Sequence, residues 1–206
     1  MSATQRLIAF EGLPFVGKST TAAALARRHN EVAMVPEYHD LLSAEARARM
    51  KQLSSSVADQ LERVSLYRDL DDRRWRLARE TGCRTVIFDR CFVSIAAYRL
   101  ALHRTFDHAG TDPAALAVDS VCEKPIPPLV VYFAVSVTTA VERHRRLVRT
   151  VDPRLCSARF LATLIDAYEQ VLAATASRVL VVDSNRPLDH VVAHACRCVD
   201  HARAAA

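Results

Sequence analysis

Short apolar runs alternate along the chain with longer segments whose apolar residues recur at helical spacing. Each run is rich in Val, Ile and Leu and lacks polar alternation, which is the pattern of a strand buried on both faces of a parallel sheet. We predict five such strands, over residues 7–11, 32–36, 84–89, 129–135 and 179–183. Helices are predicted over residues 19–29, 43–53, 57–80, 92–104, 113–122, 138–149, 158–174 and 188–204.

This alternation predicts an α/β fold with three layers, a five-stranded parallel sheet with helices on both faces. The 206 residues contain no internal repeat, low-complexity tract or interdomain linker, so residues 1–206 are expected to form a single domain. In such a sheet, ligands bind beyond the carboxyl ends of the strands. The residues that follow each predicted strand are therefore the first candidates for chemistry.

The first predicted strand is followed by Gly-x-x-x-x-Gly-Lys-Ser, the signature of a phosphate-binding loop, or Walker A motif. The strand before it and the alanine-rich helix formers after it supply the context that the motif needs, which makes a chance match the weaker interpretation. The glycines allow a sharp turn, so that loop amides and the helix N-terminus face phosphate oxygens. The residues expected to bind the nucleotide are Gly12, Leu13, Pro14, Phe15, Val16, Gly17, Lys18, Ser19 and Thr20.

Mg·ATP is the cofactor expected at this loop. Lys18 should reach the β- and γ-phosphates, and the Ser19 hydroxyl should hold Mg²⁺. Asp89 ends the third predicted strand, where a carboxylate can bind Mg²⁺ directly or through water. The sequence therefore predicts a metal site made by Ser19 and Asp89.

Two further charged residues follow predicted strands. Glu37 comes after the second strand and could accept the proton of an attacking hydroxyl group. Arg90 comes after the third strand and could neutralise a phosphate or steady a neighbouring carboxylate. The alternative interpretations are a solvated loop carboxylate for Glu37 and a surface ion pair for Asp89 and Arg90.

Arginines gather at the end of the helix predicted after the fourth strand, and a loop containing Pro153 follows them. Arginine supplies forked donors of fixed charge, so this segment suits a lid, over about residues 145–157, that closes on the transferring phosphate. A charge run is also typical of a solvated helix face, and that alternative stays open for each arginine. The candidate lid residues are Arg143, Arg145, Arg146 and Arg149.

These residues together resemble the thymidylate kinase and deoxynucleoside kinase group of P-loop kinases, in order and over nearly the whole chain. Asp89-Arg90-x-x-x-Ser94-x-x-Ala97-Tyr98 is similar to a thymidylate kinase pattern, and Leu70-Asp71-Asp72-Arg73 is similar to their helical Asp-Arg pair. The resemblance implies the three-layer P-loop nucleoside/nucleotide kinase fold. It implies an acceptor site that includes Glu37, Tyr38, Tyr67, Arg73, Arg90, Ser94 and Tyr98, with the two tyrosines Tyr38 and Tyr67 also interpretable as core.

The chain also departs from thymidylate kinases. Pro14-Phe15 replaces their loop Asp-Gly, Arg99 replaces the glutamine of their Tyr-Gln pair, and Asp69 stands where an aromatic residue stacks on thymine. Pro36-Glu37 instead resembles deoxynucleoside kinases, which place a general base after the second strand. A hydroxyl acceptor would use Glu37 as base, whereas a phosphate acceptor would need cationic partners such as Arg73 and Arg99.

Three classes of function are open at this point. The leading class is ATP-dependent phosphoryl transfer to a nucleoside or nucleoside monophosphate. The second is a kinase for a hydroxyl group of another small molecule, such as an antibiotic or specialised metabolite, which the departures from the family favour. The third is a nucleotide-binding regulatory switch, which the absence of an Asn-Lys-x-Asp motif makes the least favoured.

Composition and charge limit the kinds of partner that the protein is expected to bind. The net charge of +5 and the pI near 9.1 suit a protein that handles anions, but the arginines are dispersed among acids, so no nucleic-acid partner is expected. No apolar run approaches the roughly 20 residues that span a bilayer, and no membrane partner is expected. The scattered cysteines suit reduced thiols in a cytoplasmic protein. A homodimer is implied by the resemblance alone.

Overall fold

The computed structural model describes residues 5–53, 56–106, 124–146 and 153–204. Within these residues, five parallel strands form one sheet in the order β2-β3-β1-β4-β5. The prediction of a five-stranded parallel sheet is confirmed, with boundaries that differ by one residue or less at most ends. The strands are β1 (Arg6–Gly12), β2 (Val32–Val35), β3 (Thr85–Asp89), β4 (Leu129–Ala134) and β5 (Arg178–Asp183).

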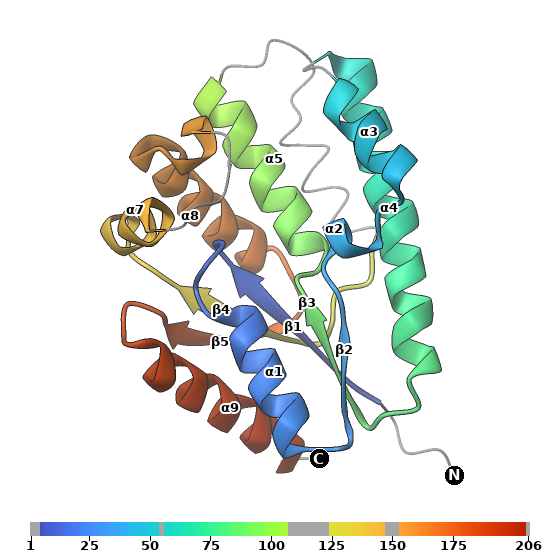
Figure 1. The fold of residues 1–206 in the computed structure, drawn as a ribbon, viewed down its shortest axis with the longest axis vertical. Helices are drawn as coiled ribbons and strands as arrows, with labels where there is room; N and C mark the ends of the chain where they lie inside the picture. The colour runs from blue at the N-terminus through green and yellow to red at the C-terminus, as the bar shows by residue number, and fades with distance from the viewer. Residues whose placement is uncertain (1–4, 54–55, 107–123, 147–152, 205–206) are drawn as a thin grey trace.

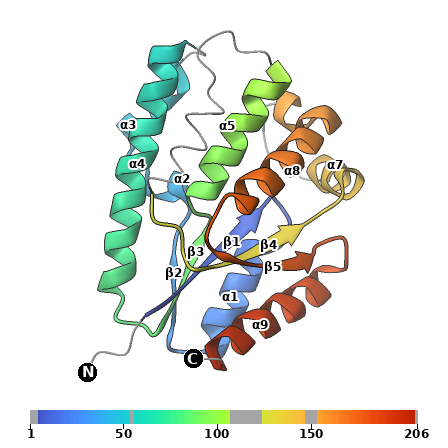
Figure 2. The same cartoon turned by 180° about the vertical axis from the view of Figure 1, so that it is seen from behind.

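Helices cover both faces of the sheet and complete the three predicted layers. On one face, α1 (Lys18–Arg28) packs against α9 (Leu188–Ala204), as Figure 1 shows. On the other face, α5 (Phe92–Phe106) packs against α8 (Ala158–Ala173), and the view from behind shows this pair in front of the strands (Figure 2). The long helix α4 (Val57–Glu80) contacts β2 at the edge of the sheet.

Four helices begin directly after a serine, which is a favoured N-cap residue. In each case the serine Oγ accepts a hydrogen bond from the backbone N–H three residues on and so satisfies an otherwise unpaired donor. The serines are Ser43 before α3 (Ala44–Gln52), Ser56 before α4, Ser136 before α7 (Val137–Arg145) and Ser157 before α8. These local signals explain why the predicted helix starts agree with the structure.

Two short elements were not predicted, α2 (Tyr38–Leu41) and the 3₁₀ helix η1 (Pro153–Cys156). Each has only 4 residues, too few for a helical repeat of apolar positions to be visible. The helix predicted over 113–122 lies outside the described residues, as do residues 147–152 of the predicted lid.

The edge strand β5 departs from the expectation that all five strands are buried on both faces. β5 pairs only with β4, and Val181 on it is 58% exposed. By contrast, every residue of β3 is buried, and so are the last five residues of β1. An apolar run therefore predicted the strand but not its place at the edge of the sheet.

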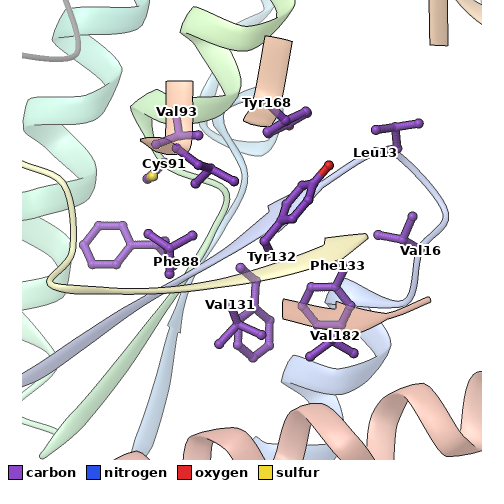
Figure 3. Packing of buried hydrophobic residues seen from close by; sticks show 14 of the residues in the cluster. Leu13, Val16, Phe88, Cys91, Val93, Val131, Tyr132, Phe133, Tyr168 and Val182 are labelled. Carbon is purple, nitrogen blue, oxygen red and sulfur yellow. The ribbon is translucent and has the colours of Figure 1, made fainter. Parts of the chain in front are cut away.

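The loop between β1 and α1 is anchored in the hydrophobic core. Leu13 and Val16 are buried and belong to the same cluster as Phe133 of β4 and Val182 of β5 (Figure 3). Interiors of this kind are close-packed, so these two side chains fix the loop relative to the sheet. The backbone of the loop is thereby held at the carboxyl ends of the strands.

None of the helices in the part of the chain that the structure describes is long and apolar enough to cross a membrane.

Candidate active site

The sheet order brings together the three strand ends that carry the predicted chemistry. β3 lies between β2 and β1, with Val35 paired to Phe88 and Phe10 paired to Asp89. The segments that follow these strands therefore meet at one edge of the sheet. They are the phosphate loop, Glu37 and the pair Asp89-Arg90.

The phosphate loop requires glycine at both glycine positions of the Walker A motif, Gly12 and Gly17. Gly12 has φ +130°, and a Cβ added there would lie 2.7 Å from the carbonyl oxygen of Phe133. Gly17 has φ +103°, and an added Cβ would lie 3.0 Å from Leu188 Cδ1. Phe15 also has a left-handed backbone, with φ +64°, at the position where thymidylate kinases usually have glycine. This conformation costs a non-glycine residue about 1–2 kcal/mol, so Phe15 stores strain beside the nucleotide site.

Lys18 is buried at the mouth of this loop. Its Nζ donates hydrogen bonds to the carbonyl oxygens of Leu13 (2.8 Å) and Gly12 (3.1 Å). Burial and the nearby positive charge of Arg90 lower the pKa of Lys18 to about 7, against the opposing effect of neighbouring carboxylates. We expect an ammonium group that is so poorly solvated to bind a phosphate anion in place of the two carbonyl groups, and this role of Lys18 stays a prediction.

Ser19 and Asp89 form the predicted metal-binding pair. Ser19 Oγ donates a hydrogen bond to Asp89 Oδ2 over 2.8 Å, so the two oxygens are close enough to bind one cation. Hydroxyl and carboxylate oxygens are the ligands that Mg²⁺ accepts, usually together with waters and substrate phosphates. The donor set fits Mg²⁺, and the assignment of this metal site stays a prediction.

Glu37 and Arg90 form an ion pair beside the phosphate loop. Arg90 Nε lies 2.6 Å from Glu37 Oε1, and Arg90 is itself buried. Arg90 Nη1 also donates to the Gly12 carbonyl oxygen, to Ser94 Oγ and to the Tyr168 hydroxyl. The guanidinium group is therefore held through its Nε and Nη1 atoms, and it holds the Glu37 carboxylate beside the phosphate loop.

Glu11 and Tyr168 support this arrangement, although no role was predicted for either residue from the sequence. Glu11 is fully buried and accepts hydrogen bonds from the Cys91 backbone N–H and from Ser94 Oγ. The Tyr168 hydroxyl, from α8, lies 2.9 Å from Ser94 Oγ. Buried polar networks of this kind fix side-chain positions when each member has a partner. The sequence signal for Glu11 was an acid inside an apolar strand.

Arg74 of α4 is the buried arginine of the long helix. It is fully buried, and its guanidinium group donates to the carbonyl oxygens of Pro36 (2.9 Å), Asp89 (2.8 Å) and Arg90 (2.6 Å). It also stacks on the Tyr38 ring at 4.1 Å and lies 3.8 Å from Asp71. Arg74 thus joins α4 to the ends of β2 and β3.

Arg73, which the resemblance placed in the acceptor site, lies elsewhere. It is exposed and donates only a long hydrogen bond, 3.3 Å, to the Leu41 carbonyl oxygen. Its neighbour Asp72 is exposed and pairs with Lys124. Successive helical residues point about 100° apart, so the pair that resembles the family motif faces away from the site while Arg74 faces inward. In the structure Arg73 therefore lies apart from Glu37 and Arg90, and its acceptor role stays a prediction.

A cavity of about 690 Å³ opens from the phosphate loop and extends between α4 and α5. We call its part beside the loop the near end, formed by Lys18, Ser19, Glu37, Asp89 and Arg90. The predicted acceptor residues Tyr38, Tyr67, Ser94 and Tyr98 also line it, together with Pro14, Phe15, Gly17, Thr20, His39, Ile95, Leu102 and Leu155. Tyr38 is nevertheless buried and donates a 2.6 Å hydrogen bond to Asp71, so it serves as a wall.

The other part of the cavity, which we call the far end, is formed by Gln60, Arg63 and Arg99. Gln60 and Arg63 lie on α4, and Arg99 lies on the face of α5 that also carries Ile95 and Leu102. Arg99 was noted in the sequence as a departure from the family glutamine, whereas Arg63 was missed. An isolated arginine on a polar helix carries no signal that distinguishes it from a solvated residue.

The arginines predicted for the lid have different positions. Arg143 donates to the carbonyl oxygens of Ser184 (2.7 Å), Phe15 (3.3 Å) and Arg186 (3.3 Å), which ties the phosphate loop to the segment between β5 and α9. Arg145 and Arg146 are exposed, and Arg149 lies outside the described residues. The lid role of these arginines stays a prediction.

Comparison with solved structures agrees with this fold. A thymidylate kinase from Candida albicans matches with a TM-score of 0.71 and 18% identity, over 98% of this chain and 94% of that one. A deoxyadenosine kinase from M. mycoides with bound dATP matches with a TM-score of 0.70 and 18% identity, over 94% and 99% of the two chains. The resemblance to this group of P-loop kinases is thereby confirmed at the level of the fold.

Sequence comparisons give a coarser result. No curated protein sequence matches the chain. A family model described as an AAA domain matches residues 7–171, which includes the phosphate loop, Glu37, Asp89 and both ends of the cavity. Because this match covers most of the chain, the protein belongs to the AAA domain family of that model.

Proposed function

We propose that this protein transfers the terminal phosphoryl group of Mg·ATP to a hydroxyl group of a small molecule, and that the acceptor belongs first of all to the nucleoside class. The observation that carries the proposal is the Glu37 carboxylate, held by Arg90 in the same cavity as Lys18 and the Ser19–Asp89 pair. A base, a phosphate-binding cation and a metal-binding pair in one cavity are the groups that phosphoryl transfer to an alcohol needs.

The residues would divide the reaction between them. Bound Mg·ATP supplies the phosphoryl group and a metal that offsets the charge on its oxygens. Lys18 binds the β- and γ-phosphates, and Ser19 and Asp89 hold the metal directly or through water. Glu37 would accept the proton of the acceptor hydroxyl while the hydroxyl oxygen bonds to the γ-phosphorus and the bond from that phosphorus to the leaving ADP breaks. Arg90 keeps Glu37 in position and adds positive charge beside the transferring group.

A hydroxyl acceptor is favoured over a monophosphate acceptor by the placement of the arginines. An anionic phosphate beside the transferring group would need cationic partners near Glu37. Of the two candidates for that role, Arg73 lies outside the cavity on the exposed side of α4 and Arg99 lies at its far end, while Arg90 is already paired with Glu37. A nucleoside is favoured among hydroxyl compounds by the similarity to the deoxyadenosine kinase, one structure of which contains the product dCMP.

A second candidate is a kinase for a hydroxyl group on another kind of small molecule. The observation in its favour is the far end of the cavity, where Arg99 replaces the family glutamine and Arg63 lies on the facing helix. Nucleoside bases present neutral edges, for which a glutamine amide is the more usual partner. The homodimer implied by the resemblance stays a prediction under either candidate.

The experiment is a measurement of ADP formation from Mg·ATP with nucleosides, nucleoside monophosphates and hydroxylated metabolites as acceptors. We expect turnover with one hydroxyl acceptor and a loss of at least about 10³-fold in Lys18→Ala, because that variant lacks the phosphate-binding cation. Lys51→Ala, which changes an exposed lysine of α3, is the matched control and should keep normal turnover.

Two results would contradict the proposal. Turnover with monophosphates alone would show that the acceptor is a phosphate and would remove the need for a base at Glu37. Binding of ATP without transfer to any acceptor in the panel, in a folded protein, would favour the regulatory switch.

A further inference from the structure

The far end of the cavity contains two arginines that have only neutral partners. Arg63 Nη2 donates a 2.9 Å hydrogen bond to the Leu53 carbonyl oxygen, and Arg99 Nη1 donates a 3.1 Å hydrogen bond to the Gln60 carbonyl oxygen. Within the described ranges 5–53, 56–106, 124–146 and 153–204, no carboxylate forms an ion pair with either guanidinium group. The far end thus carries two positive charges without a compensating acid among those residues.

The lack of a counter-charge affects Arg99 more strongly than Arg63. It is only 9% exposed, and its buried Nε has no hydrogen-bond partner in the described structure. Burial, together with the positive charge of Arg63, lowers its pKa to about 10. A buried charge without a counter-charge is unfavourable for folding, because the group has lost its hydration and gained nothing equivalent.

The other buried arginines of the described residues do have partners that compensate their charge. Arg90 pairs with Glu37 and has three further acceptors, and Arg74 has three carbonyl acceptors with Asp71 nearby. Only Arg99, among the buried arginines of the described residues, combines a single neutral acceptor with an unpaired Nε. Since it lines the cavity, the missing partner can come from a ligand.

The position of the pair excludes the transferred phosphate as that partner. Arg74 fixes α4 to the ends of β2 and β3, at the level of the near end. Arg63 precedes Arg74 by about three turns, which corresponds to roughly 16 Å along the helix. Arg99 contacts Gln60 on that same distant part of α4. An anion bound by the pair is therefore separated from the phosphate loop by the length of the acceptor.

We propose that the acceptor carries an anionic group, a carboxylate or a phosphate, at the end opposite its reacting hydroxyl, and that Arg63 and Arg99 bind this group. The proposal rests on the proposed function, because it takes the occupant of the cavity to be the acceptor. Guanidinium groups bind carboxylates and phosphates through two parallel hydrogen bonds, and two of them on facing helices form a clamp. The aliphatic wall formed by Ile95 and Leu102 lies along the same face of α5.

The test compares binding of compound pairs that differ in one anionic group, with ADP and Mg²⁺ present so that no transfer takes place. Suitable pairs place the charge far from a free hydroxyl group: 5-carboxyuridine with its amide, 4-(hydroxymethyl)benzoate with its amide, and 4-(hydroxymethyl)phenyl phosphate with 4-(hydroxymethyl)phenol. Across this panel we expect the anionic members to bind at least about tenfold more tightly, since charge-assisted hydrogen bonds are the stronger ones. Carboxylate and phosphate pairs identify which anion is preferred.

Variants then locate the preference. Arg99→Gln, which restores the family residue, and Arg63→Gln should each remove most of the preference for anions, so that the anionic and neutral members of a pair bind about equally. Arg76→Gln, a change of an exposed arginine on α4, should leave the preference intact. Because these measurements need no turnover, failure of the proposed function would show as absent transfer and would not alter them.

Three results would overturn the proposal. The first is equal binding of neutral and anionic members across the panel. The second is an undiminished preference in Arg99→Gln. The third is that guanosine, added to the panel as a further neutral compound, binds most tightly, since its O6 and N7 are neutral acceptors that arginine also recognises.

The unliganded protein gives an independent readout. Arg99→Gln should raise its Tm relative to wild type and to Arg76→Gln, because the variant no longer buries an unpaired charge. A lower Tm would mean that Arg99 is satisfied within the protein, and that result would also overturn the proposal.

Discussion

At the near end of the cavity each carboxylate has a partner, since Glu37 is bonded to Arg90 and Asp89 to Ser19. At the far end, Arg63 and Arg99 donate, among the residues that the structure describes, only to backbone carbonyl groups. The near end is thus assembled in the unliganded structure, and it contains the groups to which we assign the proposed phosphoryl transfer. The far end is electrostatically incomplete, and it is there that one acceptor can be distinguished from another.

This difference between the two ends shows where to look for substrate choice in a kinase of this fold. Groups that are fixed by the protein itself provide the reaction, because preorganised charges need no rearrangement as the reaction proceeds. Groups left without a partner provide selectivity, because a ligand that lacks the complementary charge leaves them unpaired. The predictions below change one end at a time.

Besides the loss of turnover expected for Lys18→Ala, the largest effect is expected from Glu37→Gln at the near end. The variant keeps the shape of the side chain but cannot accept the acceptor proton, so kcat on a hydroxyl acceptor should fall by about 10²-fold or more. Steady-state kinetics with the acceptor identified by the panel would measure it. KM for ATP should change little, because the phosphate loop is untouched.

Glu80→Gln, which changes an exposed glutamate at the end of α4, is the control for this variant and should keep wild-type kinetics. A kcat for Glu37→Gln within about twofold of wild type would mean that no base is needed there. Glu37 would then contribute a charge to the near end of the cavity but would not act as a base.

The second effect concerns stability and should have opposite signs for two buried arginines. Arg74→Met leaves three carbonyl oxygens without a donor and the buried Asp71 without its cation, so the free energy of unfolding should fall by about 3–5 kcal/mol. Arg99→Gln should instead raise it. Urea unfolding monitored by circular dichroism would measure both.

Arg76→Met, on the exposed side of the same helix, should change the free energy of unfolding by no more than about 0.5 kcal/mol. If Arg74→Met cost less than about 1 kcal/mol, α4 would be held by other contacts and the internal pairing of the near end would be less important than proposed.

The smallest effect is a proton taken up when nucleotide binds. Because the pKa of Lys18 is about 7 in the unliganded protein, most of its amino groups are neutral at pH 8, and a bound phosphate favours the charged form. Nucleotide binding at pH 8 should therefore take up roughly half a proton or more. Calorimetry in buffers of different ionisation enthalpy measures this uptake, and Lys18→Met should abolish it.

The same shift predicts how stability depends on pH. The pKa of Lys18 lies below its ordinary value of 10.5, so the unfolded chain holds more protons than the folded one between about pH 7 and 10.5. The contribution of Lys18 to the free energy of unfolding should then rise with pH across that window. A difference between wild type and Lys18→Met that does not depend on pH would contradict this.

The sequence was sufficient to predict most of the fold. Apolar runs without polar alternation located all five strands, and serine caps explain the agreement at several helix starts. The phosphate loop and the strand-end residues Glu37, Asp89 and Arg90 were predicted together because parallel strands bring their carboxyl ends to one edge. This part of the site follows from local motifs and sheet topology alone.

The rest of the site depends on how helices rotate and pack, which local motifs do not specify. The motif at Asp72-Arg73 is one residue out of phase with the buried stripe of α4, which contains Asp71, Arg74 and Ala78. The spacing of that stripe was a usable signal for Arg74. Arg63 gave no such signal, because its position in the cavity depends on the distance between α4 and α5.

The continuity of α4 between the two ends has a consequence for the size of the acceptor. Gln60, Arg63 and Tyr67 lie along one face of this helix and line the cavity at successive turns, while Arg74 fixes the helix to the sheet. Cavity-lining residues on successive turns of this helix are therefore separated by about 5.4 Å along its axis. Exchanging Arg63 with Gln60 or Tyr67 should lengthen or shorten the preferred substrate by about that step, so that size selection could be redesigned without altering the catalytic groups.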